Sequence, residues 1–230
     1  MPYLATYVSF LVIIQIKGIV EPPGRDWLLL PQVLIPGGLL LYYLVRHAYP
    51  ELQGIRFSLL GPLADIAVGL LVGILWMAPY VLGWFSHPPA DEGFDSAALA
   101  GDRFSGMFLT LRFVGFVLVT PFVEELFVRS ALLRYVAGMR TGTDFRRVPL
   151  ARFEWAGFIA TVLYFTFSHA SWEWPVAFVI GVVLNLWLYH RGSLGSTIRA
   201  HAVANGTIYL AVVFPGVVEF GKDLDLRYFL

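Results

Sequence analysis

Three short polar motifs interrupt apolar stretches of the sequence, and together their side chains could carry out hydrolytic chemistry. In chain order they hold Glu124, Glu125 and Arg129, then Phe165 and His169, then His201 and Asn205. Carboxylates and imidazoles exchange protons with water, and a side-chain amide donates hydrogen bonds to a developing oxyanion. An ionisable side chain inside a membrane segment costs about 2.5–3.5 kcal/mol on insertion scales, so each of these groups is a functional hypothesis.

The first motif follows Pro121 in a stretch that is otherwise apolar enough to be buried. On a helix, Glu125 and Arg129 lie four residues apart and face each other, while Glu124 lies about 100° away on a neighbouring face. This spacing predicts one paired carboxylate and one free carboxylate. The alternative is an interfacial ion-pair cluster at a helix end, from which Arg129 reaches the lipid headgroups.

The two histidine motifs place their residues on shared helix faces. Phe165 precedes His169 by one turn at the end of an apolar segment, and His201 and Asn205 project from one stripe into the helical bundle. Each pair also has a structural alternative. A lone histidine at a helix end is commonly interfacial, and an asparagine between membrane helices commonly joins them.

The rest of the sequence predicts the elements that must hold these side chains. Of the 230 residues, 58% are hydrophobic and 14% are charged, whereas a soluble domain has about 25% charged residues. Several apolar runs reach the roughly 20 residues that a helix needs to cross hydrocarbon. The runs are 1–16, 27–45, 66–90, 155–172, 174–190 and 200–218, with a seventh, 106–137, interrupted by charges. We predict an all-α fold, a polytopic transmembrane helical bundle of about seven or eight helices.

Charge and polarity divide the chain and orient it. Residues 1–105 are expected to form N-terminal transmembrane helices and a polar loop, 106–214 a core with nearly all buried polar residues, and 215–230 a polar C-terminal tail. The arginine-bearing loops are 46–58, 138–154 and 190–199. The positive-inside rule places them on the cytoplasmic side, which predicts a multi-pass protein of the cell inner (plasma) membrane.

Two absences narrow the function. The 16 basic and 16 acidic residues cancel, so the electrostatic footprint of a nucleic-acid binder is missing and no nucleic-acid partner is expected. The chain has no cysteine, which excludes disulfides, thiol nucleophiles and thiolate metal sites. The expected surroundings are therefore the lipid bilayer and a substrate or partner within it.

The ordered motifs, on successive helices over residues 106–214, resemble the CAAX protease and bacteriocin-processing family (CPBP, also called Abi) of intramembrane endopeptidases, which includes type II CAAX prenyl endopeptidases. This resemblance implies a CPBP-like catalytic core in which Glu124 and His169 hold and activate a water and His201 and Asn205 steady the oxyanion. Glu125 and Arg129, with Phe165, would then support the site. The surrounding sequence looks most like a bacterial branch found with exosortase protein-sorting systems, which suggests such a system as a partner.

Other protease chemistries lack their motifs here, since no His-Glu-x-x-His occurs. No cofactor is expected under the metal-free mechanism. The alternative is zinc held by Glu124, His169 and His201 with a fourth position open. The implied function is hydrolysis of a peptide bond in a membrane-associated protein or peptide. The competing class is a non-catalytic scaffold, immunity, ion-binding or transport protein that uses the same polar cluster.

Four further polar residues receive structural interpretations. Asp65 and Arg112 are expected near helix ends, where a solvated or paired group is commoner than a catalytic one. Asn185 is interpreted as a helix-helix contact. Glu173, just past His169, has no role in the family pattern and is interpreted as a loop residue.

Overall fold

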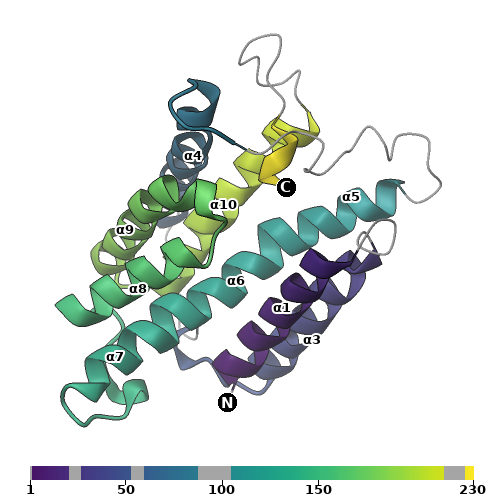
Figure 1. The fold of residues 1–230 in the computed structure, drawn as a ribbon. Helices are drawn as coiled ribbons and strands as arrows, with labels where there is room; N and C mark the ends of the chain where they lie inside the picture. The colour runs from purple at the N-terminus through teal and green to yellow at the C-terminus, as the bar shows by residue number, and fades with distance from the viewer. Residues whose placement is uncertain (1, 21–26, 53–59, 88–104, 215–225) are drawn as a thin grey trace.

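The computed structural model describes residues 2–20, 27–52, 60–87, 105–214 and 226–230, and these residues form helices and loops without a strand (Figure 1). This confirms the predicted all-α fold. The helices are α1 (Pro2–Ile19), α3 (Leu29–Val45), α4 (Leu60–Val81), one long helix from Ser105 to Met139, α8 (Trp155–Phe167), α9 (Trp174–Arg191) and α10 (Leu194–Val213). Short 3-10 turns are η1 (Pro50–Leu52), η5 (Phe145–Arg147), η6 (Ser171–Glu173) and η8 (Arg227–Phe229).

Two stretches of the long helix are π-helical rather than α-helical. Its segments are α5 (Ser105–Phe113), η3 (Val114–Val119), α6 (Thr120–Glu125), η4 (Leu126–Leu132) and α7 (Leu133–Met139), and η3 and η4 are π-helical. A π-helical segment inserts extra residues per turn and often marks a functional site. Here the two π-helical segments flank α6, which carries both glutamates of the first motif.

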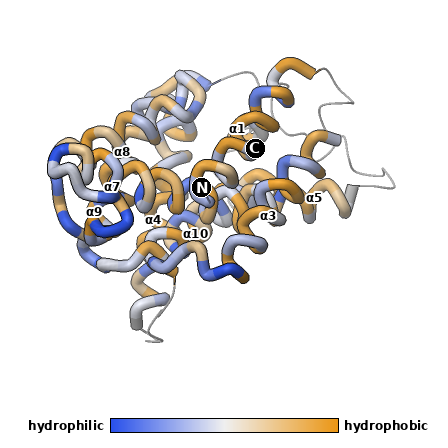
Figure 2. Tube along the Cα trace, turned by 90° about the horizontal axis from the view of Figure 1, so that it is seen from below, coloured by the Kyte–Doolittle hydropathy of each residue, from blue (hydrophilic) through white to orange (hydrophobic). Residues whose placement is uncertain are grey.

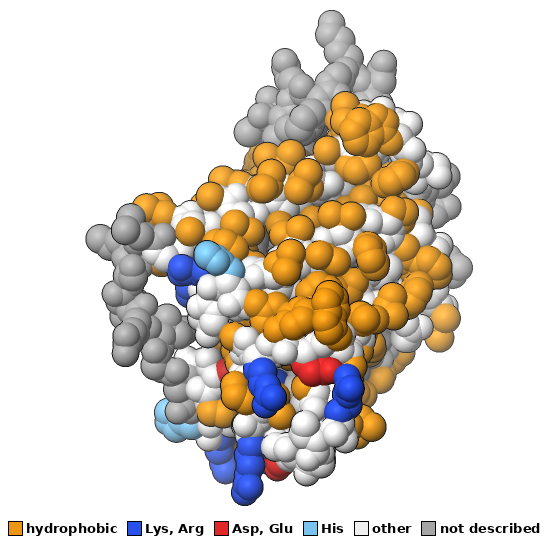
Figure 3. Space-filling model, turned by 90° about the vertical axis from the view of Figure 1, so that its left-hand side faces the viewer, with side chains coloured by type: hydrophobic (Ala, Val, Ile, Leu, Met, Phe, Trp, Pro, Cys, Tyr) orange, Lys and Arg blue, Asp and Glu red, His pale blue; other side chains and the backbone are white. Residues whose placement is uncertain are grey.

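The outer surface is that of a membrane protein. Four helical stretches are long and apolar enough to cross a bilayer, namely Pro2–Ile19, Gly61–Val81, Gly106–Met139 and Ser171–Arg191, while α3 and α8 are shorter apolar helices. Large apolar side chains face outward, including Val45 at 79% exposed and Leu41 at 64%. Figure 3 shows hydrophobic side chains covering much of one face of the molecule, with most of the arginine and lysine side chains visible there at its lower end. A surface of this kind, on helices long enough to span a bilayer, is suited to contact with lipid.

The basic loops gather at one end of the bundle, together with the start of α1 (Figure 1). The Tyr3 ring lies 5.8 Å from that of Phe145, and the Tyr3 hydroxyl donates to Glu51 over 3.0 Å. This grouping agrees with the prediction that the three arginine-bearing loops lie on one side of the membrane. Residues 53–59 of the first loop lie outside the described part of the chain. Viewed from that end in Figure 2, the helices carry apolar residues over most of their length.

His201 is placed by the close packing of α10 against α4. A Cβ atom at Gly69 would lie 2.5 Å from the carbonyl oxygen of Ala200, and one at Gly73 would lie 2.8 Å from that of Ala204. Small residues four apart let membrane helices approach closely. The contact fixes the stretch of α10 that presents His201 between those two alanines.

Three expected boundaries differ from those observed. The helix over the apolar run 66–90 is α4, which ends at Val81. The last helix, α10, begins at Leu194, six residues before the run at 200. It begins there because Ser193 caps it by accepting from the Ser196 amide. In the tail expected to be polar, residues 215–225 lie outside the described part. Its last residues instead pack into the protein, with Leu226, Tyr228 and Phe229 buried.

Candidate active site

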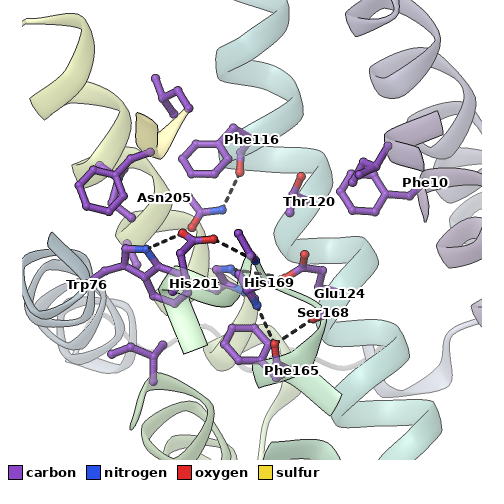
Figure 4. Close-up of a pocket in the computed structure, with 18 of the residues that line it drawn as sticks. Phe10, Trp76, Phe116, Thr120, Glu124, Phe165, Ser168, His169, His201 and Asn205 are labelled. Atoms are coloured by element: carbon purple, nitrogen blue, oxygen red, sulfur yellow. Dashed lines mark hydrogen bonds and ion pairs between the residues drawn. The ribbon is translucent and has the colours of Figure 1, made fainter. Parts of the chain in front are cut away.

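A cavity of about 360 Å³ lies between the long helix, α1, α4, α10 and the junction of α8 with α9 (Figure 4). All four residues predicted to be catalytic line it, together with Phe165. They are Glu124, His169, His201 and Asn205. The motifs are far apart in the sequence, and the fold brings them to one space. Tyr228, Phe229 and Leu230 also line this cavity, so the end of the described chain forms part of its wall.

Glu125 and Arg129 form the buried base of the site. Arg129 Nη1 donates to Glu125 Oε1 over 2.9 Å, and both side chains are 0% exposed. Arg129 Nε also donates to Asn185 over 3.3 Å, and its guanidinium lies 4.2 Å from the centre of the Phe165 ring. The predicted pairing is confirmed. The alternative in which Arg129 reaches the headgroups is wrong, because the side chain is enclosed by protein.

The same carboxylate orients His201. His201 Nδ1 lies 2.7 Å from Glu125 Oε1, and since an ionised carboxylate only accepts, Nδ1 carries the proton and donates. This leaves His201 Nε2 toward Glu124, whose Oε2 lies 3.9 Å away. Glu124 Oε2 is buried and has no hydrogen-bond partner in the described part of the protein. A gap of this size between two polar atoms suits a bridging water.

His169 is held by the end of α8. Its Nδ1 lies 2.6 Å from the Phe165 carbonyl oxygen, which can only accept, so Nδ1 donates and Nε2 is left as an acceptor. The ring lies 4.5 Å from that of Phe165 and 5.1 Å from that of Trp76. The predicted contact of Phe165 with His169 is therefore confirmed. The imidazole within 4 Å of Glu124 Oε2, however, is that of His201, whereas the resemblance implies that Glu124 and His169 hold the water.

Asn205 uses one of its two amide hydrogens within the protein. Its Nδ2 donates to the carbonyl oxygen of Phe116 over 2.8 Å, and Phe116 belongs to the π-helical segment η3. An extra residue in a helical turn disturbs the backbone hydrogen-bond ladder, so a side chain can occupy such a carbonyl. The second Asn205 hydrogen stays available for a ligand.

Two charged residues interpreted as structural also line the cavity, namely Glu173 and Arg112. Glu173 accepts from Trp76 Nε1 over 3.2 Å and from the Ala170 amide over 3.3 Å. Its interpretation as a loop residue was therefore incomplete. The available signal was its spacing of four residues after His169, and for Arg112 it was a guanidinium within the apolar segment 106–137.

The metal alternative finds little support in the arrangement of side chains. Within the described ranges, no three side chains of histidine, aspartate or glutamate come together as a metal site would require. This includes the set proposed for zinc, Glu124, His169 and His201. The donors that do converge are suited to holding a water.

One comparison with known proteins finds a match over part of the chain. Residues 106–207 match the family model described as Type II CAAX prenyl endopeptidase Rce1-like. The match contains all three polar motifs and the helices that carry them. No curated protein and no solved structure matches the chain.

Proposed function

We propose that the chain is an intramembrane endopeptidase that hydrolyses a peptide bond through a water activated by Glu124, in keeping with the match of residues 106–207 to a type II CAAX prenyl endopeptidase family model. One observation carries the proposal. Glu124 Oε2 is a buried oxygen without a hydrogen-bond partner among the described residues, and it lies 3.9 Å from His201 Nε2 across the cavity. A carboxylate held in this way is free to take a proton from a water.

The reaction requires a water between Glu124 and His201. Glu124 takes a proton from this water as the water oxygen bonds to the scissile carbonyl carbon, which forms a tetrahedral oxyanion. The oxyanion then collapses, the carbon–nitrogen bond breaks, and Glu124 returns the proton to the leaving amine. Glu125 has a different role, because its hydrogen bond with His201 Nδ1 fixes which imidazole nitrogen faces the water.

Two further side chains serve the carbonyl group. The amide hydrogen of Asn205 that Phe116 does not use donates to the oxyanion, and losing one such donor typically costs about 10²–10³ in rate. His169, with Nε2 as an acceptor, lies in the same cavity and is proposed to steady the attacking water from the side of Trp76. Figure 4 shows Glu124, His169 and His201 directed toward one space.

The substrate class follows from the location of the site. The cavity lies within a bundle whose outer face is apolar, so the peptide must reach it from the bilayer. We therefore propose a membrane-associated protein or peptide substrate, a setting in the cell inner membrane, and a catalytic core over 106–214. An exosortase-type sorting system is proposed as the bacterial context of that substrate.

The deciding experiment compares Glu124→Gln with the wild type. Both proteins, reconstituted in liposomes, are incubated with acylated peptides, and the products are identified by mass spectrometry. Glu124→Gln should retain its melting temperature and lose cleavage, because Gln keeps the volume but cannot take a proton. Glu154→Gln, in the loop before α8, is the matched control and should cleave normally. Cleavage by Glu124→Gln would refute the catalytic role, and an inactive wild type would favour a non-catalytic scaffold, immunity or ion-binding protein.

Metal content separates the remaining mechanisms. We expect elemental analysis of active protein to find no stoichiometric metal, and activity to survive a strong chelator. Zinc that is lost from His201→Ala, together with activity that falls on chelation and returns with added zinc, would overturn the metal-free mechanism. The protease assignment would survive that result.

A further inference from the structure

Arg112 is a charged side chain in the cavity wall to which the proposed hydrolysis gives no role. It is the one arginine or lysine among the described residues that line the cavity, and it lies on the same long helix as Glu124. A guanidinium within an apolar membrane segment is costly. We therefore expect the guanidinium to bind a ligand or to lie along the path of a substrate.

The winding of the helix brings Arg112 to the cavity. On an uninterrupted α-helix, residues 12 apart are separated by about 120° after three full turns, so Arg112 and Glu124 would face different sides. The π-helical segment η3 (Val114–Val119) lies between them. Because each π-helical residue turns the chain through a smaller angle, this segment reduces the separation, and both side chains line one cavity.

The surroundings of Arg112 suit a carboxylate. The amides of Gln15 and Gln32 line the same cavity, and the Arg112 guanidinium lies 5.9 Å from the centre of the Phe116 ring. Of the two carboxylates in the cavity, Glu173 accepts from Trp76 Nε1 over 3.2 Å and Glu124 Oε2 lies 3.9 Å from His201 Nε2. A guanidinium binds a carboxylate through two parallel hydrogen bonds, a geometry that a lysine cannot reproduce.

We propose that Arg112 binds a carboxylate of the peptide substrate and thereby sets the distance from that carboxylate to the cleaved bond. This proposal rests on the proposed peptidase function. At 1.5 Å per residue, Arg112 and Glu124 are about 18 Å apart along the helix, which an extended peptide spans with about five residues. The carboxylate is therefore expected about five residues from the bond. It belongs either to the peptide terminus or to an acidic side chain.

Binding to a cleavage-deficient protein tests this without depending on turnover. The probes are three fluorescent, N-terminally acylated heptapeptides of apolar residues, one with a free C-terminal carboxylate, one with a terminal amide, and one with a terminal amide and an internal Glu. Their Kd values are measured with Glu124→Gln protein, alone and combined with Arg112→Gln or Arg112→Lys. Arg147→Gln, an exposed arginine of the 138–154 loop, is the control.

We expect Arg112→Gln to raise the Kd of at least one carboxylate peptide roughly 10- to 100-fold, with no change for the peptide without a carboxylate. Arg112→Lys should recover part of the affinity, and Arg147→Gln should change nothing. The peptide that responds identifies the source of the carboxylate. Equal affinity for all three peptides, or an equal loss for all three on Arg112→Gln, would refute the proposal.

Turnover separates this proposal from the proposed function. In protein with Glu124 intact, Arg112→Gln should raise KM for the carboxylate peptide and leave kcat within a few-fold. Carboxylate-dependent binding in a protein that never cleaves would support the role of Arg112 and contradict the peptidase function. Cleavage that is indifferent to the carboxylate would do the reverse.

Discussion

Buried clusters of carboxylate and arginine recur among the described residues of this bundle, and two of them differ in that one lines the cavity of the candidate site and the other does not. The cavity cluster consists of Glu124, Glu125, Arg129 and His201. The clamp cluster consists of Asp65, Trp187, Arg191 and Arg199, and it joins α4 to α9 and α10. Both place a fully buried carboxylate beside arginine, so burial and charge alone do not distinguish a functional site from a structural one.

In the clamp cluster, both oxygens of the carboxylate accept hydrogen bonds. Asp65 Oδ2 accepts from Arg199 over 2.6 and 2.9 Å, and Oδ1 accepts from Trp187 Nε1 over 3.2 Å, with Arg191 Nε 3.4 Å away. Its two arginines are 28% and 34% exposed. A carboxylate bound from two sides by cations that reach water is suited to fastening helices together.

The cavity cluster has the opposite balance. Glu125 binds both the fully buried Arg129 guanidinium and the His201 imidazole, whereas Glu124 Oε2, 3.9 Å from His201 Nε2, has no hydrogen-bond partner among the described residues. An unsatisfied buried oxygen is costly in a merely structural cluster, but it is required of a group that must accept a proton. The surplus carboxylate, rather than the ion pair beside it, therefore marks the site.

The largest effect on stability is expected from Glu125→Gln, because this change removes the partner of a buried arginine. Arg129 is 0% exposed and cannot reach water, and breaking such a pair typically costs about 3–5 kcal/mol. His201 also loses the carboxylate that orients it, so cleavage should fall as well. Melting temperature and activity in detergent check both effects. If Glu125→Gln is as stable as Glu124→Gln, the pair of Glu125 with Arg129 does not stabilise the active site.

Asp65→Asn should have a smaller effect on stability and leave catalysis nearly intact. Arg191 and Arg199 lose their shared carboxylate, but both are partly exposed and can be hydrated, so a loss of about 1–3 kcal/mol is expected. Melting temperature and kcat/KM are measured beside those of Glu125→Gln. A fall in kcat/KM larger than the loss of folded protein explains would show that the clamp cluster serves the active site, which would remove the distinction between the two clusters.

The sequence predicted which residues belong to the cavity cluster better than it predicted which of them contact each other. The four-residue spacing was enough to pair Glu125 with Arg129, since it follows from the period of a helix. The contact of His201 with Glu125 depends on how α10 lies against the long helix, which spacing within one segment does not determine. The same holds for Asp65, which was expected near a helix end as a solvated or paired group: it lies near the start of α4 and is paired, but its partners come from α9 and α10.

The fold class was predictable for a similar reason, and the finer geometry was not. Apolar runs predict helices across a bilayer, but they do not indicate the π-helical segments η3 and η4, which depend on packing on all sides of the long helix. Because of η3, a helical wheel would separate Arg112 from Glu124. The pair Gly69 and Gly73 was a readable signal for the close contact of α4 with α10, and it indicates where His201 must lie.

The smallest effect is expected at Glu154, a carboxylate outside both clusters that caps α8. Its side chain accepts from the Gly157 amide over 2.8 Å and from Arg140 over 2.7 Å. The bond from the Gly157 amide, with those from Ala156 and Arg140, holds the pKa of Glu154 below its usual value. A lowered pKa means that this carboxylate stabilises the fold at pH values above about 4.3, and that the stabilisation is lost as the pH falls through the lowered pKa.

Glu154→Ala should therefore cost about 0.5–1 kcal/mol at pH 7 and progressively less on acidification, with no change in kcat. Glu154→Gln should cost less at pH 7, because its amide oxygen still accepts from Gly157, and it should remove the pH dependence. Apparent melting temperatures of the three proteins from pH 7 to pH 3 measure this difference. A Glu154→Ala deficit that stays constant down to pH 3 would show that the charge at this cap contributes nothing, unlike the charges in both buried clusters.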